Sequence, residues 1–284
     1  TGDVESTWEG LRTTLRALLG LSLSGVYFVG SDIGGFSGNP SPELYLRWFQ
    51  MAALTPFFRL HAARWTKRRE PWRFGEEVLE GVRRAMALRE SLLPYLYTLA
   101  HRASREGKPL LRPLFLEGGP YTEEAFLLGE ALLVAPVLEE GARAKEVPLP
   151  KGGWYPWGED RALQGPTWAR LPAPLDRIPL LVRAGTVLPL LEEGGLALHL
   201  YPGAEGAEGR LYWDEGEGEG PYRLDRFRLL WQGKGELPWP WARVRLRLFG
   251  KRLLRAHVEG EAHAAEEGGV LLPPFREALL EVEG

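Results

Sequence analysis

The chain has 284 residues, 44% of them hydrophobic and 26% charged, which predicts a packed protein of one large or two to three smaller domains. The formal net charge of −3 argues against nucleic acid or an anionic membrane as a partner, and no apolar run reaches the roughly 18 residues of a membrane-spanning helix. The absence of cysteine excludes disulfides and thiolate metal sites.

Two further features of the sequence bear on its source and location. Asparagine occurs once and methionine twice, which fits a thermophilic organism, although GC-rich codon usage explains the same bias. No signal peptide is visible, so we expect a cytoplasmic protein. The sequence does not begin with methionine, and a true N-terminus further upstream would hide such a peptide.

The first third of the chain alternates helical patterns with short apolar runs. Ser6 and Glu9 form a capping box, which predicts a helix that begins with Ser6 as its N-cap and ends at Gly20. Two short apolar runs, 25–29 and 56–61, are typical of parallel strands that are buried on both faces. Strands that alternate with helices indicate βα units.

Two more helices are expected in this part of the chain. One covers residues 43–54, between the two predicted strands, and follows a loop rich in glycine and proline. The other spans residues 74–105, with a kink at Pro94 because proline interrupts helical hydrogen bonding.

After Gly107 the pattern changes to short β-type runs separated by glycine and proline, and helical periodicity is largely absent. The runs include residues 111–115, 131–137, 180–190, 197–201, 222–231, 243–249 and 251–258. They predict one or two antiparallel β domains, with a boundary near the Leu-Glu-Glu-Gly-Gly segment at 191–195. The predicted domains are residues 1–106, 107–191 and 192–284.

Polar and aromatic side chains follow the two predicted strands. Ligands of βα folds bind at the carboxyl ends of the strands. Asp32 and Phe36 come after the first strand, Arg59 and His61 end the second, and Asp3 would follow a strand that the sequence does not contain. A pair of carboxylates is the minimal machinery for glycoside hydrolysis. The set therefore indicates a polar site of a kind that suits carbohydrate.

Each of these residues also has a simpler interpretation. Asp3 fits the negative charge that is favoured near a helix N-terminus, and Asp32 fits a turn residue that bonds its own backbone. Arg59 and His61 fit a structural ion pair or partners for buried carbonyl groups, and Phe36 fits core packing. The residue patterns alone indicate a βα domain with a polar site, joined to β domains.

Longer stretches resemble family 31 of the glycoside hydrolases, which contains α-glucosidases and α-xylosidases. The stretches are TGDVESTWEGL, GVYFVGSDIGGFSGNPSPELYLRWFQMAALTPFFRLH, EPWRFG, LRESLLPYLYTLAHRASREGKPLLRPLF, APLDRIPLLVRAGTVLPL and LYWDEGEGEGPY. They run along most of the chain, and a block of this length is more specific than any single short motif.

The resemblance implies an α/β plus all-β chain: the C-terminal part of a (β/α)₈ TIM barrel, followed by two antiparallel β-sandwich domains. It implies a retaining mechanism through a covalent glycosyl–enzyme intermediate, with Asp3 as the general acid/base. Asp32, Phe36, Arg59 and His61 match the glycosyl-binding subsite, where His61 would donate a hydrogen bond to a hydroxyl. No metal or organic cofactor is implied, and the partner is an α-linked oligosaccharide substrate.

One part of the family pattern is absent. The family nucleophile is the Asp of a W-x-D-M-N-E-type segment, and the only asparagine of this chain, Asn39, lies in no such segment. We therefore expect the chain to begin after the sixth barrel strand and to need the N-terminal half of the barrel. On its own it is expected to be inactive, and a homo-oligomer is left open.

Two other functions are left open. One is an α-xylosidase of the same family, and the other is a non-catalytic carbohydrate-binding protein or pseudoenzyme, in which Asp3 and Asp32 would be structural. The GSDIGGF…RLH block favours an enzyme, because a pure binding module has no need of it. The expected activity is release of α-linked glucose from non-reducing ends.

Overall fold

The structure of this chain is a computed structural model. It describes residues 2–192, 195–204, 206–218, 220–229, 234–235, 244–249, 253–258, 261–266, 269–272 and 278–282. The chain divides into two compact units. The first contains residues 1–90, 102–151 and 164–181, and the second contains residues 91–101, 152–163 and 182–284.

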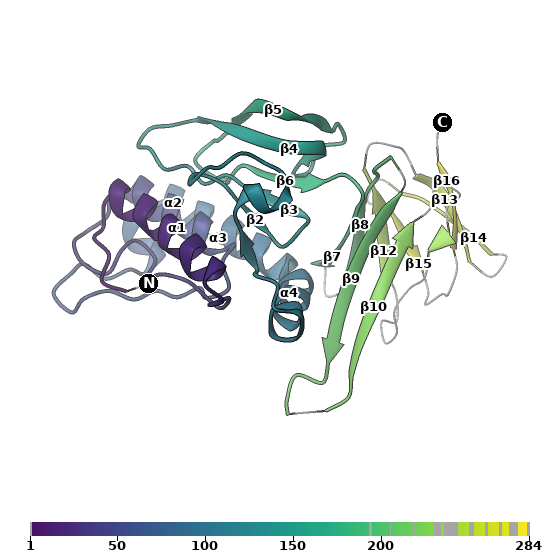
Figure 1. The fold of residues 1–284 in the computed structure, drawn as a ribbon, viewed down its shortest axis with the longest axis horizontal. Helices are drawn as coiled ribbons and strands as arrows, with labels where there is room; N and C mark the ends of the chain where they lie inside the picture. The colour runs from purple at the N-terminus through teal and green to yellow at the C-terminus, as the bar shows by residue number, and fades with distance from the viewer. Residues whose placement is uncertain are drawn as a thin grey trace. The chain divides into compact units, whose positions relative to one another are not determined.

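All helices of the described residues lie before residue 118. The α-helices are α1 (Trp8–Leu23), α2 (Pro42–Ala52), α3 (Glu76–Ser91) and α4 (Leu93–Glu106), and the 3₁₀-helices are η1 (Pro71–Phe74) and η2 (Leu114–Glu117) (Figure 1). The predicted helix over 43–54 is confirmed as α2, which Ser41 caps. Helices α2 and α3 share one apolar cluster, to which Tyr45 and Phe49 contribute from α2 and Val78 and Val82 from α3.

Helix α1 has a different N-cap from the one predicted. Thr7, not Ser6, caps it: Oγ1 of Thr7 accepts a hydrogen bond from the backbone N–H of Gly10 at 2.9 Å. Ser6 instead donates its hydroxyl to the carbonyl of Ser37 at 2.7 Å. The local capping pattern was wrong because a long-range contact holds Ser6 outside the helix.

The predicted end of this helix is also wrong. Helix α1 continues past Gly20 to Leu23. Its last turns carry Leu18, Leu19 and Ser22, all buried. Burial of these side chains offsets the roughly 1 kcal/mol that a glycine costs in a helix interior.

The predicted long helix over 74–105 is two helices. Helix α3 ends at Ser91 and α4 begins at Leu93. The break lies within two residues of Pro94, whose ring crowds the preceding turn and which has no amide hydrogen. The helix is therefore interrupted near Pro94, where a kink was predicted.

The two predicted strands of the first third, 25–29 and 56–61, do not form regular strands. Asp32, just after the first run, and Arg59, within the second, make an isolated parallel bridge. The backbone N–H of Phe57 also donates to the carbonyl of Val29 at 3.0 Å. The expected parallel neighbourhood is thus present, but the ladder is too short for a strand. Pro56, which has no amide hydrogen to donate, contributes to this.

The described strands form three sheets (Figure 1). The first sheet has the order β1-β2-β3-β6-β4-β5, with β1 (Leu111–Arg112), β2 (Phe126–Leu128), β3 (Leu132–Val134), β6 (Leu180–Arg183), β4 (Ala144–Pro156) and β5 (Leu163–Pro172). The second has the order β10-β9-β7-β8-β12-β15, with β10 (Tyr222–Leu229), β9 (Ala207–Asp214), β7 (Thr186–Glu192), β8 (Gly195–Tyr201), β12 (Val244–Leu248) and β15 (Val270–Leu272). The third has the order β11-β16-β13-β14, with β11 (Lys234–Gly235), β16 (Ala278–Val282), β13 (Leu253–Val258) and β14 (Glu261–Ala264).

The β part of the chain is mainly antiparallel, as predicted. Strand β7 pairs antiparallel with β8, β9 with β10, and β13 with both β14 and β16. Parallel pairs also occur, β8 with β12 and β7 with β9. Buried residues from several strands of the second and third sheets, including Leu198, Phe227, Leu246 and Ala256, make one apolar cluster.

Two of the predicted β runs are divided in the structure. The run 111–115 is the two-residue strand β1 followed by η2, and the run 180–190 is β6 and β7 separated by a turn. The β7–β8 hairpin lies across the predicted boundary between 191 and 192. The three-domain division and the two β-sandwiches stay predictions. No helix among the described residues has the length and apolar character needed to cross a membrane.

Candidate functional site

A buried carboxylate and an exposed arginine form the centre of the candidate site. The side chain of Asp32 is 3% exposed, and its Oδ1 lies 2.8 Å from Nε of Arg59, whose side chain is 61% exposed. The same two residues pair through their backbones. A buried carboxylate needs such a partner, because leaving its charge unpaired away from water is unfavourable. Most of the arginine side chain remains open to solvent.

Phe36 connects its own loop to the other two segments of the site. Its backbone N–H donates to the carbonyl of Val4 at 2.7 Å, and its carbonyl accepts from the N–H of Ala63 at 2.8 Å. Its ring centroid lies 5.6 Å from that of His61, with the rings tilted by 31°. The loop around Phe36 therefore holds the segment that carries Asp3 on one side and the segment that carries His61 on the other.

Asp3 is the residue before Val4, and it is exposed. It has a φ of 59°, the only positive φ of a non-glycine residue in the described chain. Aspartate tolerates this left-handed conformation better than most residues, and such strained positions are concentrated at functional sites. Asp3 lies four residues before the N-cap Thr7, and the acidic residue in the first turn of α1 is Glu9. The interpretation of Asp3 as a helix-end charge is therefore not favoured.

The structure thus brings the five predicted residues onto three adjoining segments. Asp3 lies in the first, Asp32 and Phe36 in the second, and Arg59 and His61 in the third. Direct side-chain contacts join Asp32 to Arg59 and Phe36 to His61. The roles assigned to them by resemblance stay predictions.

Arg69 is a residue of this region that the sequence did not reveal. It is 5% exposed, and its Nη2 lies 3.1 Å from the hydroxyl of Ser6, 3.1 Å from the carbonyl of Gly35 and 2.8 Å from that of Gly38. Burial lowers the pKa of Arg69 from its ordinary value. One guanidinium therefore ties the Asp3 segment to the glycine-rich loop. Nothing in the sequence separates it from Arg68, because its role depends on contacts with distant residues.

The close approach of these two segments requires a glycine. Gly35 has a φ of +84°, and a Cβ placed there would lie 2.7 Å from the backbone nitrogen of Ser6. Since real side chains do not approach so closely, only glycine allows the loop to pack on the Asp3 segment.

Arg89, on α3, fixes the turn that leads into the third segment. Its Nη1 donates to the carbonyls of Ala53 at 2.9 Å and Thr55 at 2.7 Å, and its Nη2 donates to that of Pro56 at 2.9 Å. These three carbonyls come just after helix α2 and would otherwise lack helical partners. Because Arg59 follows three residues later, this contact positions the arginine of the candidate site.

A metal centre is not indicated by the described part of the chain. It contains no group of three or more His, Cys, Asp or Glu side chains that could hold a metal ion. The candidate site offers instead exposed hydrogen-bonding groups beside a partly buried ring. This combination suits a polar, uncharged ligand with apolar faces, such as a sugar.

Comparison with known proteins places these observations in a family. Residues 1–99 match the glycosyl hydrolases family 31 TIM-barrel domain, and residues 107–188 match the glycosyl hydrolase family 31 C-terminal domain. A "Probable glucan 1,3-alpha-glucosidase" of Arabidopsis thaliana is 42% identical over 236 residues, which cover 76% of this chain and 25% of that protein. "Neutral alpha-glucosidase C" of Homo sapiens is 39% identical over 234 residues, which cover 76% of this chain and 26% of that protein.

A solved structure extends the similarity to nearly the whole chain. The crystal structure of the glucosidase II alpha subunit, in a form described as alpha3-Glc2-bound, superposes with a TM-score of 0.83 at 27% identity. It covers 99% of this chain and 36% of that one. The chain therefore spans about a quarter of its curated relatives and about a third of the solved one. From its two matched domains and these relatives, we conclude that the chain belongs to glycoside hydrolase family 31, with the C-terminal part of a TIM barrel followed by a β-rich region.

Proposed function

We propose that this chain is part of a retaining α-glucosidase that releases α-linked glucose from the non-reducing ends of its substrates. The observation that carries the proposal is the convergence of Asp3, Asp32, Phe36, Arg59 and His61 on three hydrogen-bonded segments of a family 31 chain. The relatives named alpha-glucosidases support the choice of substrate class.

Asp3 acts as the general acid and base in this proposal. As an acid it protonates the glycosidic oxygen of the leaving group, and as a base it then removes a proton from the water that hydrolyses the glycosyl–enzyme intermediate. Both steps need a carboxyl group that substrate and water can reach. The exposure of Asp3 supports this role.

The other four residues hold the terminal glucose unit. The Asp32 carboxylate and the Arg59 guanidinium, already paired, offer acceptors and donors to neighbouring hydroxyls. His61 donates a hydrogen bond to a further hydroxyl. The ring of Phe36, which lies beside His61, packs against an apolar face of the sugar.

The second carboxylate of the retaining pair is proposed to come from a segment outside these 284 residues. A retaining site needs a nucleophile about 5–5.5 Å from the acid/base, and the sequence has no W-x-D-M-N-E segment to supply it. The isolated chain is accordingly expected to hydrolyse no α-glucoside.

Substitution of Asp3 in the full-length gene product tests this function. We expect Asp3→Asn to lower kcat for maltose by about 10²–10⁴-fold, the usual contribution of general acid catalysis. Glu5→Gln is the matched control, since Glu5 is also an exposed carboxylate of the same segment. Unchanged maltose hydrolysis by Asp3→Asn would reject Asp3 as the acid, and an inactive wild-type enzyme would reject the proposed activity.

A further inference from the structure

A pocket that is separate from the candidate site lies wholly within the first compact unit. It has a volume of about 400 Å³, within the range of roughly 300–1,000 Å³ that is typical of small-ligand sites. Helix α1, the loop before β2, and the strands β4 and β5 contribute its lining. None of Asp3, Asp32, Phe36, Arg59 and His61 is among the lining residues.

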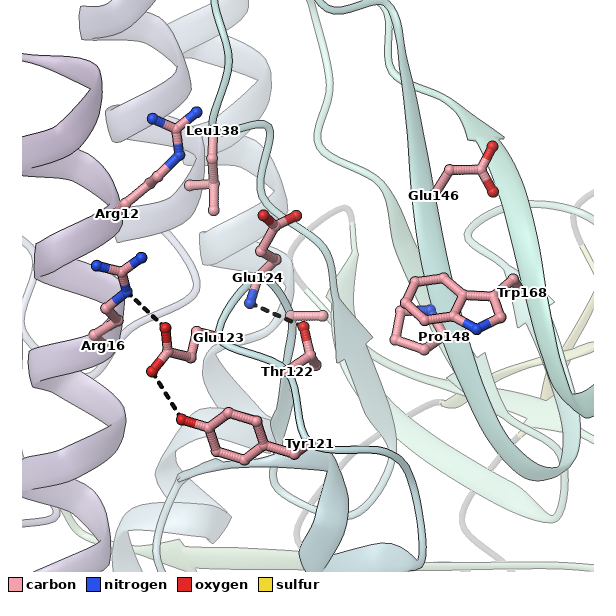
Figure 2. Close-up of a pocket in the computed structure, with 11 residues that line it drawn as sticks. Arg12, Arg16, Tyr121, Thr122, Glu123, Glu124, Leu138, Glu146, Pro148 and Trp168 are labelled. Carbon is pink, nitrogen blue, oxygen red and sulfur yellow. Dashed lines mark hydrogen bonds and ion pairs between the residues drawn. The ribbon is translucent and has the colours of Figure 1, made fainter.

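Two aromatic side chains with unusually exposed rings face this pocket. Trp168, on β5, is 64% exposed, and Tyr121 is 73% exposed. Figure 2 shows Trp168 beside Pro148 on one side of the pocket, and Tyr121 on the side of Arg16. A tryptophan this exposed lacks the stabilising free energy that a large apolar ring gains when it is buried. A ligand that covers the ring would recover it.

Hydrogen bonds and ring contacts hold the tyrosine side of the pocket in place. The hydroxyl of Tyr121 donates to Oε1 of Glu123 at 2.8 Å, and Oε2 of Glu123 lies 2.8 Å from Nε of Arg16 on α1 (Figure 2). The Tyr121 ring stacks on that of Phe115, with centroids 6.3 Å apart. The ring is thus positioned before any ligand binds, which reduces the entropy lost on binding.

The charges around the pocket are of both signs. Arg12 and Arg16 line it together with Glu123, Glu124 and Glu146. Mixed charges of this kind do not favour a strongly anionic or cationic ligand. They offer donors and acceptors for many hydroxyl groups, which is what a neutral sugar presents between its apolar faces.

We propose that this pocket is a second carbohydrate-binding site, in which a glucose unit of an α-linked glucan stacks on Trp168 and its neighbours contact Tyr121 and the charged rim. The two rings and the mixed charges carry the assignment to carbohydrate. The choice of an α-linked glucan rests on the proposed function. Such a site holds a long substrate on the protein independently of the cleavage site.

Binding of maltotetraose to the full-length gene product tests the proposal. Asp32→Asn removes a carboxylate of the candidate active site while keeping its side-chain volume, and should weaken maltotetraose binding there. The Kd that calorimetry measures for this variant therefore reports mainly binding in the Trp168 pocket. We expect maltotetraose to bind this variant, and the added change Trp168→Ala to weaken its Kd at least about tenfold. Trp72→Ala is the matched control, since Trp72 is 66% exposed and does not line the pocket. It should change the Kd less than about twofold.

Two results would overturn the second site. One is a Kd that Trp168→Ala changes by less than about twofold, and the other is no binding at all by Asp32→Asn. Trp168→Phe keeps a smaller ring. In the Asp32→Asn background, its Kd for maltotetraose should lie between those of Trp168 and Trp168→Ala. This order separates loss of the stacking ring from misfolding. Hydrolysis of a small aryl α-glucoside is measured in parallel. Its absence in the wild type, with Trp168-dependent binding retained, would reject the proposed activity and leave the second site standing.

Discussion

Nη2 of Arg69 lies 3.1 Å from the hydroxyl of Ser6, so a buried guanidinium holds the segment that carries Asp3 against the glycine-rich loop. The same nitrogen reaches the carbonyls of Gly35 and Gly38. The other terminal nitrogen, Nη1, donates to the carbonyl of Lys67 at 2.8 Å. A guanidinium spans both sets of acceptors with two nitrogens, and a lysine ammonium, which has one, cannot.

Arg69→Lys is therefore expected to destabilise the protein. Hydrogen bonds to a charged group contribute about 1.5–3 kcal/mol each, and we expect a loss of about 2–3 kcal/mol in the free energy of unfolding. Urea denaturation measures it. Arg68→Lys is the control, because the Arg68 side chain is 74% exposed and should lose less than about 0.5 kcal/mol. Equal stability of the two variants would show that Arg69 does not hold the segments together.

Gly35→Ala tests the close approach of the loop to Ser6. The new Cβ meets the Ser6 backbone at 2.7 Å and also has to adopt a φ of +84°. Gly118→Ala is the matched control, since Gly118 has a φ of +72° in the left-handed helical region, with nothing within 4 Å. We expect the control to lose about 1 kcal/mol from its backbone conformation alone, and Gly35→Ala to lose at least about twice as much. Thermal unfolding compares them, and a smaller loss for Gly35→Ala would contradict the packing.

The Asp32–Arg59 pair predicts coupled effects on substrate binding. Arg59→Met leaves a buried carboxylate without its partner, and Asp32→Asn removes the charge that Arg59 neutralises. We expect each change to raise KM for an aryl α-glucoside. The double variant should raise KM by much less than the product of the single effects, because the pair acts as one unit. Multiplicative effects would mean that the two side chains act independently.

Glu130 gives the protein a predictable dependence on acid. Its two carboxylate oxygens accept from Arg102 at 3.0 and 3.1 Å. Burial alone would raise the pKa of Glu130, but the hydrogen bonds and charge of Arg102, helped by Lys108 and Arg112, lower it from 4.5 to about 2.

Since the pKa of Glu130 is lower in the folded state, the unfolded state binds more protons between pH 2 and 4.5. The stabilisation is fully present above pH 4.5 and is lost as the pH falls toward 2. Glu130→Gln should therefore be less stable than the wild type at pH 6, and the difference should shrink by pH 3. A difference that stays constant across this range would contradict the lowered pKa.

The sequence predicted which candidate residues come together better than it predicted the strands around them. Asp32, Arg59 and His61 could be identified because they lie within a long stretch that matches a family pattern. The strands expected at 25–29 and 56–61 did not form, because an apolar run does not show whether a neighbouring segment supplies a full ladder. Arg69 could not be found, since its partner Ser6 is 63 positions away and its neighbour Arg68 looks the same in sequence.

Two long strands of the first sheet lie in the region predicted to be β but outside the runs named from the sequence. Strand β4 contains the sequence AKEVPLPKGGWYP, and β5 contains LQGPTWARLP. Proline and glycine normally interrupt strands, and both occur within these two stretches, so their sequences do not resemble strands. Helices were more predictable: α2 has a serine cap followed by proline, and Pro94 marks the break between α3 and α4.

The leaving-group dependence of Asp3→Asn tests the central claim most directly. A 2,4-dinitrophenolate needs no proton to depart, whereas the sugar released from maltose does. In the full-length gene product, we predict that Asp3→Asn lowers the kcat/KM of maltose by about 10²–10⁴-fold and that of 2,4-dinitrophenyl α-glucoside by less than about tenfold. An equal loss on both substrates, or no loss on maltose, would contradict the assignment of Asp3 as the general acid.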